Sequence, residues 1–215
     1  MSPERPRGAG RGVVGVLLAG GLARRMGGGD KALRRLGGET LLARAIARVA
    51  PQVRVLLLNA NGDPARFAAY GLPVAGDVVE GFAGPLAGVL TGLEWAKAHA
   101  PDCPWVATFA TDAPFVPSDL VARMLEAVEG EGADMASAAS AGRPHPVFGL
   151  WPVRLAGDLR RAMVERHVRK VDVWTGGYRL AVVDYPDRPF DPFFNANTPE
   201  DLEEAERLIA AGGPP

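Results

Sequence analysis

Short, continuously apolar runs alternate along this chain with longer segments in which apolar residues recur every three or four positions. The short runs predict buried strands, because a strand covered on both faces has no polar side. The longer segments predict amphipathic helices with one apolar stripe. The predicted strands span residues 13–18, 53–58, 72–75, 105–109, 134–140, 146–151 and 178–183. The predicted helices span residues 40–49, 64–70, 85–99, 118–128, 153–165 and 167–174, with a last helix that opens at Thr198.

Two of these helices carry recognisable start signals. Thr198 is followed by Pro199 in the first turn and by an acid, Asp201, three residues after the cap, which is the pattern of a capped helix N-terminus. Ser118 is the expected cap of the helix over residues 118–128.

The order of strands and helices predicts the fold class. Alternating strands and helices with continuously apolar strands favour an α/β fold, with a mainly parallel sheet covered by helices on both faces. We expect one domain over residues 13–211, with a nucleotide-binding half at about 13–130 and a half shaped for a second substrate at about 131–211. Residues 1–12 are rich in Pro, Gly and Arg without an apolar period, so we expect a disordered tail there.

Composition and charge narrow the range of partners. The 24 Lys and Arg against 25 Asp and Glu give a net charge of −1, which argues against a nucleic-acid partner. Cys103 is the only cysteine, so an intramolecular disulfide and a zinc cluster of cysteines are excluded, and a reducing compartment is favoured. No apolar run approaches the roughly 20 residues that span a bilayer, and the first is too short for a signal-peptide core. We therefore expect a cytoplasmic protein with no membrane partner, as a monomer or weak oligomer.

The loop after the first predicted strand holds the strongest chemical signal. Five glycines and three cations (Arg24, Arg25 and Lys31) fall within thirteen residues. Glycines allow backbone N–H groups to approach phosphate oxygens, and cations neutralise them. The alternative is a flexible surface loop with solvated charges. The spacing matches neither the Walker pattern nor the dinucleotide fingerprint, which argues against a dehydrogenase.

Polar side chains also follow the other early strands. Asn59, Asp77 and Asp112 each come after a predicted strand, and ligands of open parallel sheets bind beyond the carboxyl ends of the strands. We therefore expect these residues to meet the glycine-rich loop at one edge of the sheet. Asp112 suits Mg²⁺, which takes one or two carboxylates plus substrate phosphates. The alternative for Asp112 is a turn former before Ala113 and Pro114.

Several motifs together resemble one enzyme family. Residues 18–31 read LAGGLARRMGGGDK and resemble the LAGG…RMG…K signature of nucleotidyltransferases. Further motifs are GPLAGVL at 84–90, TDAP at 111–114, HPVF at 145–148 and NANTPE at 195–200. As a set they resemble the molybdenum cofactor guanylyltransferase family, over about residues 13–209. The resemblance implies a Rossmann-like, glycosyltransferase-A-like three-layer nucleotidyltransferase fold. It also implies GMP transfer from GTP to the terminal phosphate of molybdenum-bound molybdopterin, with release of pyrophosphate.

The resemblance assigns roles on the nucleotide side. Lys31 contacts the phosphates and Arg25 is a second cation; with Asp112 they form the catalytic set. Asp112 holds Mg²⁺, or alternatively Mn²⁺, and Asn197 is a second metal ligand or an orienting group, the alternative being a helix-entry turn. The residues that bind the nucleotide are Leu18, Ala19, Gly20, Gly21, Lys31, Asn59, Asp77 and Asp112. Gly21 matters for base choice, because an absent methyl makes room for a purine. For Asp77, base and ribose contacts both stay open.

The pterin side is assigned to Arg143, His145, Asn195 and Asn197. Arg143 suits a phosphate or the pterin, whereas His145 is equally well explained as a structural histidine. The expected partners are GTP and molybdenum-bound molybdopterin, with a cofactor-insertion or upstream biosynthesis protein as a third.

Other functions remain open at this stage. One alternative is a nucleotidyltransferase of the same fold that uses CTP, or that acts on a sugar or polyol phosphate. A non-enzyme alternative is a GTP-binding sensor or cofactor carrier. Gly21 argues against the CTP-dependent form, and the presence of both Lys31 and Asp112 argues against a sensor.

Overall fold

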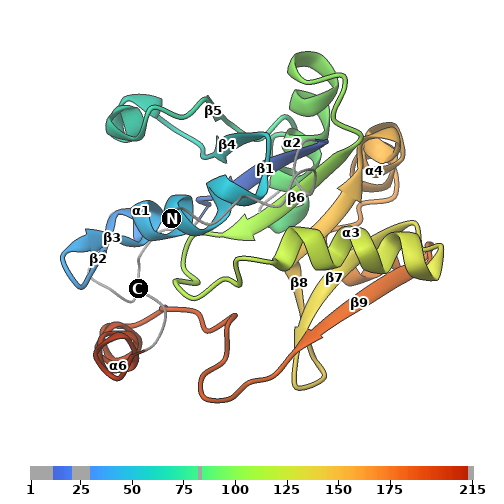
Figure 1. The fold of residues 1–215 in the computed structure, drawn as a ribbon. Coiled ribbons are helices and arrows are strands. Elements are labelled where there is room, and N and C mark those ends of the chain that lie inside the picture. Colours follow the sequence, from blue (N-terminus) through green and yellow to red (C-terminus); the bar gives the residue numbers. More distant parts are fainter. Residues whose placement is uncertain (1–11, 21–29, 82–83, 213–215) are drawn as a thin grey trace.

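A seven-stranded sheet runs through the molecule (Figure 1). The structure is a computed structural model, and it describes residues 12–20, 30–81 and 84–212. In spatial order the strands are β5 (Val74–Ala75), β4 (Val55–Asn59), β1 (Val13–Leu18), β6 (Trp105–Ala110), β8 (Arg143–Pro152), β7 (Met135–Ser140) and β9 (Leu180–Tyr185). Strand β8 runs antiparallel to both of its neighbours, and all other neighbouring pairs in this sheet are parallel. The predicted α/β fold with a mainly parallel sheet is confirmed.

Helices cover both faces of the sheet and complete three layers (Figure 1). One face is covered by α1 (Leu41–Val49) and α3 (Leu120–Glu131), the other by α2 (Pro85–His99), α4 (Ala156–Val164) and α5 (Val171–Thr175). The last helix, α6 (Pro199–Ala210), packs beside a small hairpin of β2 (Arg35–Leu36) and β3 (Glu39–Thr40). Within the described residues, no helix is long and apolar enough to cross a membrane.

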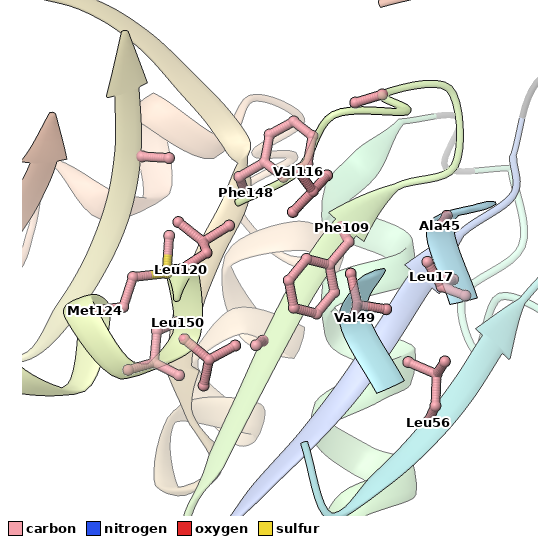
Figure 2. Packing of buried hydrophobic residues seen from close by; sticks show 14 of the residues in the cluster. Leu17, Ala45, Val49, Leu56, Phe109, Val116, Leu120, Met124, Phe148 and Leu150 are labelled. Atoms are coloured by element: carbon pink, nitrogen blue, oxygen red, sulfur yellow. The ribbon is translucent and has the colours of Figure 1, made fainter. Parts of the chain in front are cut away.

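The core is built from alternate residues of the central strands. Leu17, Leu56 and Phe109 face the layer of α1 and α3 and pack with Val49 and Met124 (Figure 2). The intervening strand positions face the layer of α2, α4 and α5. Because both faces are covered, the central strands have no polar side. Each such buried side chain stabilises the fold by roughly 1.5–3 kcal/mol relative to an exposed one.

Several local predictions differ from the structure. The segment Pro64–Tyr70 is a 3₁₀ helix. Ser118 does not cap α3, because that helix begins at Leu120 after Asp119, whose carboxylate accepts a hydrogen bond from the Tyr185 hydroxyl at 2.9 Å. The hairpin of β2 and β3 was not predicted, since strands of two residues carry no period. The capping box that opens α6 is confirmed.

Strand β8 starts three residues earlier than predicted. Ala141 and Gly142 both have positive φ, 46° and 76°, and they connect β7 directly to β8. Two-residue loops with this backbone are the usual connections of antiparallel hairpins. The tight turn therefore makes β8 antiparallel and brings Arg143 and Pro144 into the sheet.

Candidate active site

A cavity of about 600 Å³ lies at the sheet edge where β1, β4 and β6 end. Its lining includes Leu18, Ala19, Gly20, Lys31, Asn59, Asn61, Asp77, Gly84, Thr111, Asp112, Pro144, His145, Asn195 and Asn197. Parallel strands deliver their carboxyl ends to one edge. Because β8 is antiparallel to β6, the start of β8 lies at that same edge. The predicted meeting of the strand ends is thus what the structure shows.

The side chain of Lys31 contacts two residues that are far away in the sequence. Its ammonium contacts Oδ2 of Asp112 and Oδ1 of Asn197, which lie 81 and 166 residues away in the sequence. The Lys31 and Asp112 side chains are 15% and 22% exposed, so the ion pair is partly shielded from solvent. Partial shielding strengthens an ion pair relative to one fully in water.

Three hydrogen bonds from backbone N–H groups hold the segment around Asn197 in place. The neighbouring Ala196 N–H donates to the Asp112 carbonyl at 2.9 Å. The Asp201 carboxylate accepts from the N–H groups of Asn197 and Thr198, each at 2.8 Å. The first turn of α6 therefore fixes the segment that carries Asn197 against the end of β6.

Asp112 and Asn197 form the pair of side chains best suited to a divalent cation. Among the described residues there is no group of three or more His, Cys, Asp or Glu side chains that could hold a metal ion. The Asp112 carboxylate and the Asn197 amide oxygen nevertheless converge on one cation, the Lys31 ammonium. Such a set of hard oxygens fits Mg²⁺, which completes its shell with water and substrate phosphates. The residues present therefore fit the expected ion.

A second cluster surrounds the Asp77 carboxylate. The Asn59 amide donates to its Oδ1 at 3.0 Å, and the Asn61 amide donates to its Oδ2 at 2.8 Å. The Asp77 N–H donates back to Asn61 Oδ1 at 2.7 Å. An ionised carboxylate has about four acceptor positions. These bonds therefore orient Asp77 and leave it able to accept further N–H or O–H groups from a ligand.

Asn61 is a site residue that the sequence analysis missed. It lines the cavity and holds Asp77 through two hydrogen bonds. The available signal was its position two residues after Asn59 at the end of a strand, since alternate residues of an extended chain point to the same side.

Two glycines near the cavity differ in their surroundings. At Gly20, no atom of the described residues other than its chain neighbours lies within 4 Å of the place a Cβ would take. At Gly88 in α2, a Cβ would lie 2.4 Å from both Asn59 Oδ1 and Leu18 Cδ2. Gly88 thus lets α2 approach the ends of β1 and β4, whereas Gly20 leaves open space beside the cavity.

The residues assigned to the pterin side divide into two groups. His145 and Asn195 line the cavity, whereas Arg143 is not part of its lining and pairs instead with Asp191. His145 is 8% exposed, and its Nε2 lies 2.6 Å from Ser140 Oγ. Burial lowers the pKa of His145 below its usual value. His145 is therefore part of the core as well as of the cavity wall.

Two residues of the sequence-based assignment, Gly21 and Arg25, lie outside the described residues.

Comparisons with known proteins point to the same enzyme family as the sequence motifs. The family model described as "MobA-like NTP transferase domain" matches residues 15–176. The chain is 62% identical over 193 residues to a molybdenum cofactor guanylyltransferase from Rhodopseudomonas palustris (strain BisB5), covering 90% of this chain and 92% of the relative. It is 61% identical to one from Bradyrhizobium sp. (strain ORS 278), covering 92% and 93%. Its fold is similar to that of molybdopterin-guanine dinucleotide biosynthesis protein A from Archaeoglobus fulgidus, with a TM-score of 0.71, 24% identity, and coverage of 92% and 99%.

Proposed function

The chain belongs to the MobA-like NTP transferase family, and from this premise we propose that it transfers GMP from GTP to the terminal phosphate of molybdenum-bound molybdopterin. The products are the guanine dinucleotide cofactor and pyrophosphate. The observation that carries this proposal is the 62% identity, over nine-tenths of the chain, to a relative named molybdenum cofactor guanylyltransferase. The cavity supports it by gathering one cation, two carboxylates and several amides at the sheet edge where such ligands bind.

The reaction brings two anions together, and this is the main obstacle that the site must overcome. An oxygen of the pterin phosphate forms a bond to the α-phosphorus of GTP, and the bond from that phosphorus to pyrophosphate breaks. Two unit charges about 4 Å apart repel by roughly 4 kcal/mol at an effective dielectric constant near 20. Neutralisation of charge and in-line positioning therefore supply most of the rate. Lys31 lines the cavity, and we propose it as a cation that serves this purpose.

Asp112 and Asn197 are the residues we propose as ligands of Mg²⁺, or alternatively of Mn²⁺. When bound, such an ion offsets the negative charge of the triphosphate. The bond from the Ala196 N–H to the Asp112 carbonyl and the bond from the Asn197 N–H to the Asp201 carboxylate hold the backbone segments that carry these two side chains beside each other.

Asp77 is the residue we propose to read the base. Guanine presents two adjacent N–H donors on one edge, and a carboxylate accepts both. Asn59 and Asn61 fix the plane of this carboxylate. His145 and Asn195 line another part of the cavity wall, and we propose that they face the pterin.

The experiment that tests this function compares the four nucleoside triphosphates. The protein is incubated with each one, Mg²⁺ and molybdenum-loaded molybdopterin, and pyrophosphate and the dinucleotide product are measured. We expect turnover with GTP alone. Turnover with CTP but not GTP would overturn the proposal, and tight GTP binding without pyrophosphate release would favour a sensor or carrier. Gly21→Ala should reduce turnover with GTP.

We also propose a cytoplasmic location, where the molybdenum-bound pterin is delivered by an upstream biosynthesis protein. Cys103 is buried and is the only cysteine of the sequence, so no intramolecular disulfide can form, and this supports a reducing compartment.

A further inference from the structure

Arg66 is not part of the cavity lining, but it contacts two segments that contribute to that lining, one at Asn61 and one at Asp30, beside Lys31. Its Nη2 donates to the Asn61 carbonyl at 2.5 Å, and its Nη1 donates to the Asp63 carbonyl at 2.9 Å. These bonds hold the segment whose Asn61 side chain orients Asp77. One side of the guanidinium therefore supports the proposed base-reading end of the site.

The other side of Arg66 faces the segment that carries the lysine. Its Nε lies 2.7 Å from Oδ2 of Asp30, the residue before Lys31. The Nε–H is buried, and within the part of the chain that the structure describes it is not aligned with an acceptor, so its contact with Asp30 is an ion pair rather than a hydrogen bond. The side chains of Arg66 and Asp30 are 28% and 22% exposed, which limits solvent screening.

The surroundings of Arg66 suit a guanidinium in particular. Its Cζ lies 4.6 Å from the centre of the Phe67 ring, and Phe67 is 1% exposed, so the group is anchored to the core. Gly62 has a φ of +85°, and a Cβ there would lie 2.9 Å from Nη1. The backbone at Gly62 therefore lies close to the planar guanidinium group of Arg66. A lysine ammonium cannot reach two carbonyls and a carboxylate in these fixed directions.

We propose that Arg66 is a positioning residue that fixes the distance between the base-reading end of the site (Asn59, Asn61 and Asp77) and the phosphate end (Lys31, Asp112 and Asn197). This inference rests on the proposed function, because it takes a nucleoside triphosphate as the ligand that spans both ends. A ligand that spans two sites gains affinity when their separation is set beforehand. Arg66 therefore favours GTP over either of its parts.

The test measures three dissociation constants for the full-length chain in the presence of Mg²⁺: those of GTP, guanosine and inorganic tripolyphosphate. In Arg66→Lys and Arg66→Ala we expect the Kd of GTP to rise roughly 10-fold, a typical size for coupling between sites. The Kd values of guanosine and of tripolyphosphate should change less than about twofold, because each occupies one end only. Asp30→Asn should show the same pattern, and free guanidinium ion should restore GTP binding to Arg66→Ala.

Arg123→Ala is the matched control. The Arg123 guanidinium also donates to a backbone carbonyl, that of Asp184 at 3.0 Å, and lies over an aromatic ring, that of Tyr185 at 4.0 Å, but it is not part of the cavity lining. We expect it to leave all three constants unchanged, with thermal melting used to compare the folds of all variants.

The outcomes separate the inference from the function on which it rests. Wild-type protein that does not turn over GTP contradicts the proposed function, and the positioning role with it. If wild type turns over GTP, an unchanged Kd of GTP in Arg66→Lys contradicts the positioning role alone. A parallel loss of guanosine or tripolyphosphate binding also contradicts it, because Arg66 would then act on one end or on the fold. If Arg66→Ala does not fold, Arg66→Lys and Asp30→Asn still decide.

Discussion

The two halves of the sheet deliver residues to the same cavity in different ways. On the side of β5, β4, β1 and β6 all strands are parallel, so polar residues that directly follow a strand meet at one edge. On the side of β8, β7 and β9, the antiparallel β8 contributes residues from its beginning, and Asn195 and Asn197 come from the segment before α6. The parallel topology alone brings together the residues that follow β1, β4 and β6. The residues from the start of β8 and from the segment before α6 are placed instead by a tight turn and by a helix cap.

The largest effect is expected at Asp112, where the two halves meet. Its side chain contacts Lys31 while its carbonyl accepts from Ala196. Asp112→Ala should lower the rate of pyrophosphate release by about 10²–10³, the size of effect seen when one stabilising electrostatic group is removed. Manganese binding to the free protein, measured directly, should weaken in parallel.

Asp102→Ala is the control for this variant. Asp102 is an exposed acid just before the same strand, paired with Arg54, and its loss should leave turnover unchanged. If Asp112→Ala turned over GTP as fast as wild type, the proposed role of Asp112, at the junction of the two halves of the sheet, would be contradicted.

The next effect is expected for Lys31, on the parallel side. Lys31→Met keeps the length of the side chain and removes the charge. We expect the kcat/KM for GTP to fall about 10–100-fold, since hydrogen bonds to charged groups contribute about 1.5–3 kcal/mol. Lys97→Met on α2 is the control, because it makes the same lysine-to-methionine change away from the cavity lining, and its kinetics should equal those of wild type. Wild-type kinetics for Lys31→Met would remove this lysine from the site.

Two glycine variants then separate binding from folding on the parallel side. A Cβ at Gly20 meets none of the described residues beyond its chain neighbours within 4 Å, so the melting temperature of Gly20→Ala should stay unchanged while the Kd of GTP rises about 10-fold through steric conflict with the nucleotide. Gly88→Ala meets Asn59 and Leu18 at 2.4 Å, so it should lower the free energy of unfolding by about 1–3 kcal/mol. The opposite pattern would show that Gly20 supports the fold rather than the ligand.

The smallest effect concerns His145, on the antiparallel side. Burial lowers its pKa, so the folded state binds fewer protons than the unfolded state below about pH 6.5. Its contribution to stability is therefore fully present above the unfolded pKa of 6.5 and is lost as the pH falls below it. Between about pH 7.5 and about pH 5.5, the melting temperature of wild type should fall more than that of His145→Asn. If the melting temperatures of wild type and His145→Asn depended on pH in the same way, His145 would not be a buried histidine that stays neutral in the folded state.

The same contrast explains what the sequence could predict. Asn59 and Asp112 were predictable because each follows a predicted apolar strand, and parallel strands share an edge, whereas Leu18 was assigned through the family motif. Asn197 was found through its motif, but the contacts that hold it, from Ala196 to Asp112 and from Asp201, depend on tertiary structure.

The missed features have equally specific causes. The ion pair of Arg143 with Asp191, 48 residues away, was not predicted, because pairing at that separation leaves no local pattern; the assignment of Arg143 to the pterin stays a prediction. Ser118 has the right residue type for a cap, but the helix begins two residues later. The role of Arg66 depends on contacts with Asp30 and Asn61, and these contacts leave no local pattern in the sequence.

The contact of Lys31 with Asn197 also sets when a working site can exist during synthesis of the chain. Translation proceeds from the N-terminus and domains fold as their parts emerge. The two residues are 166 positions apart. A growing chain on the ribosome therefore presents Lys31 and the first strands long before Asn197 has been added, and it can assemble the complete cavity only after Asn197 has been synthesised.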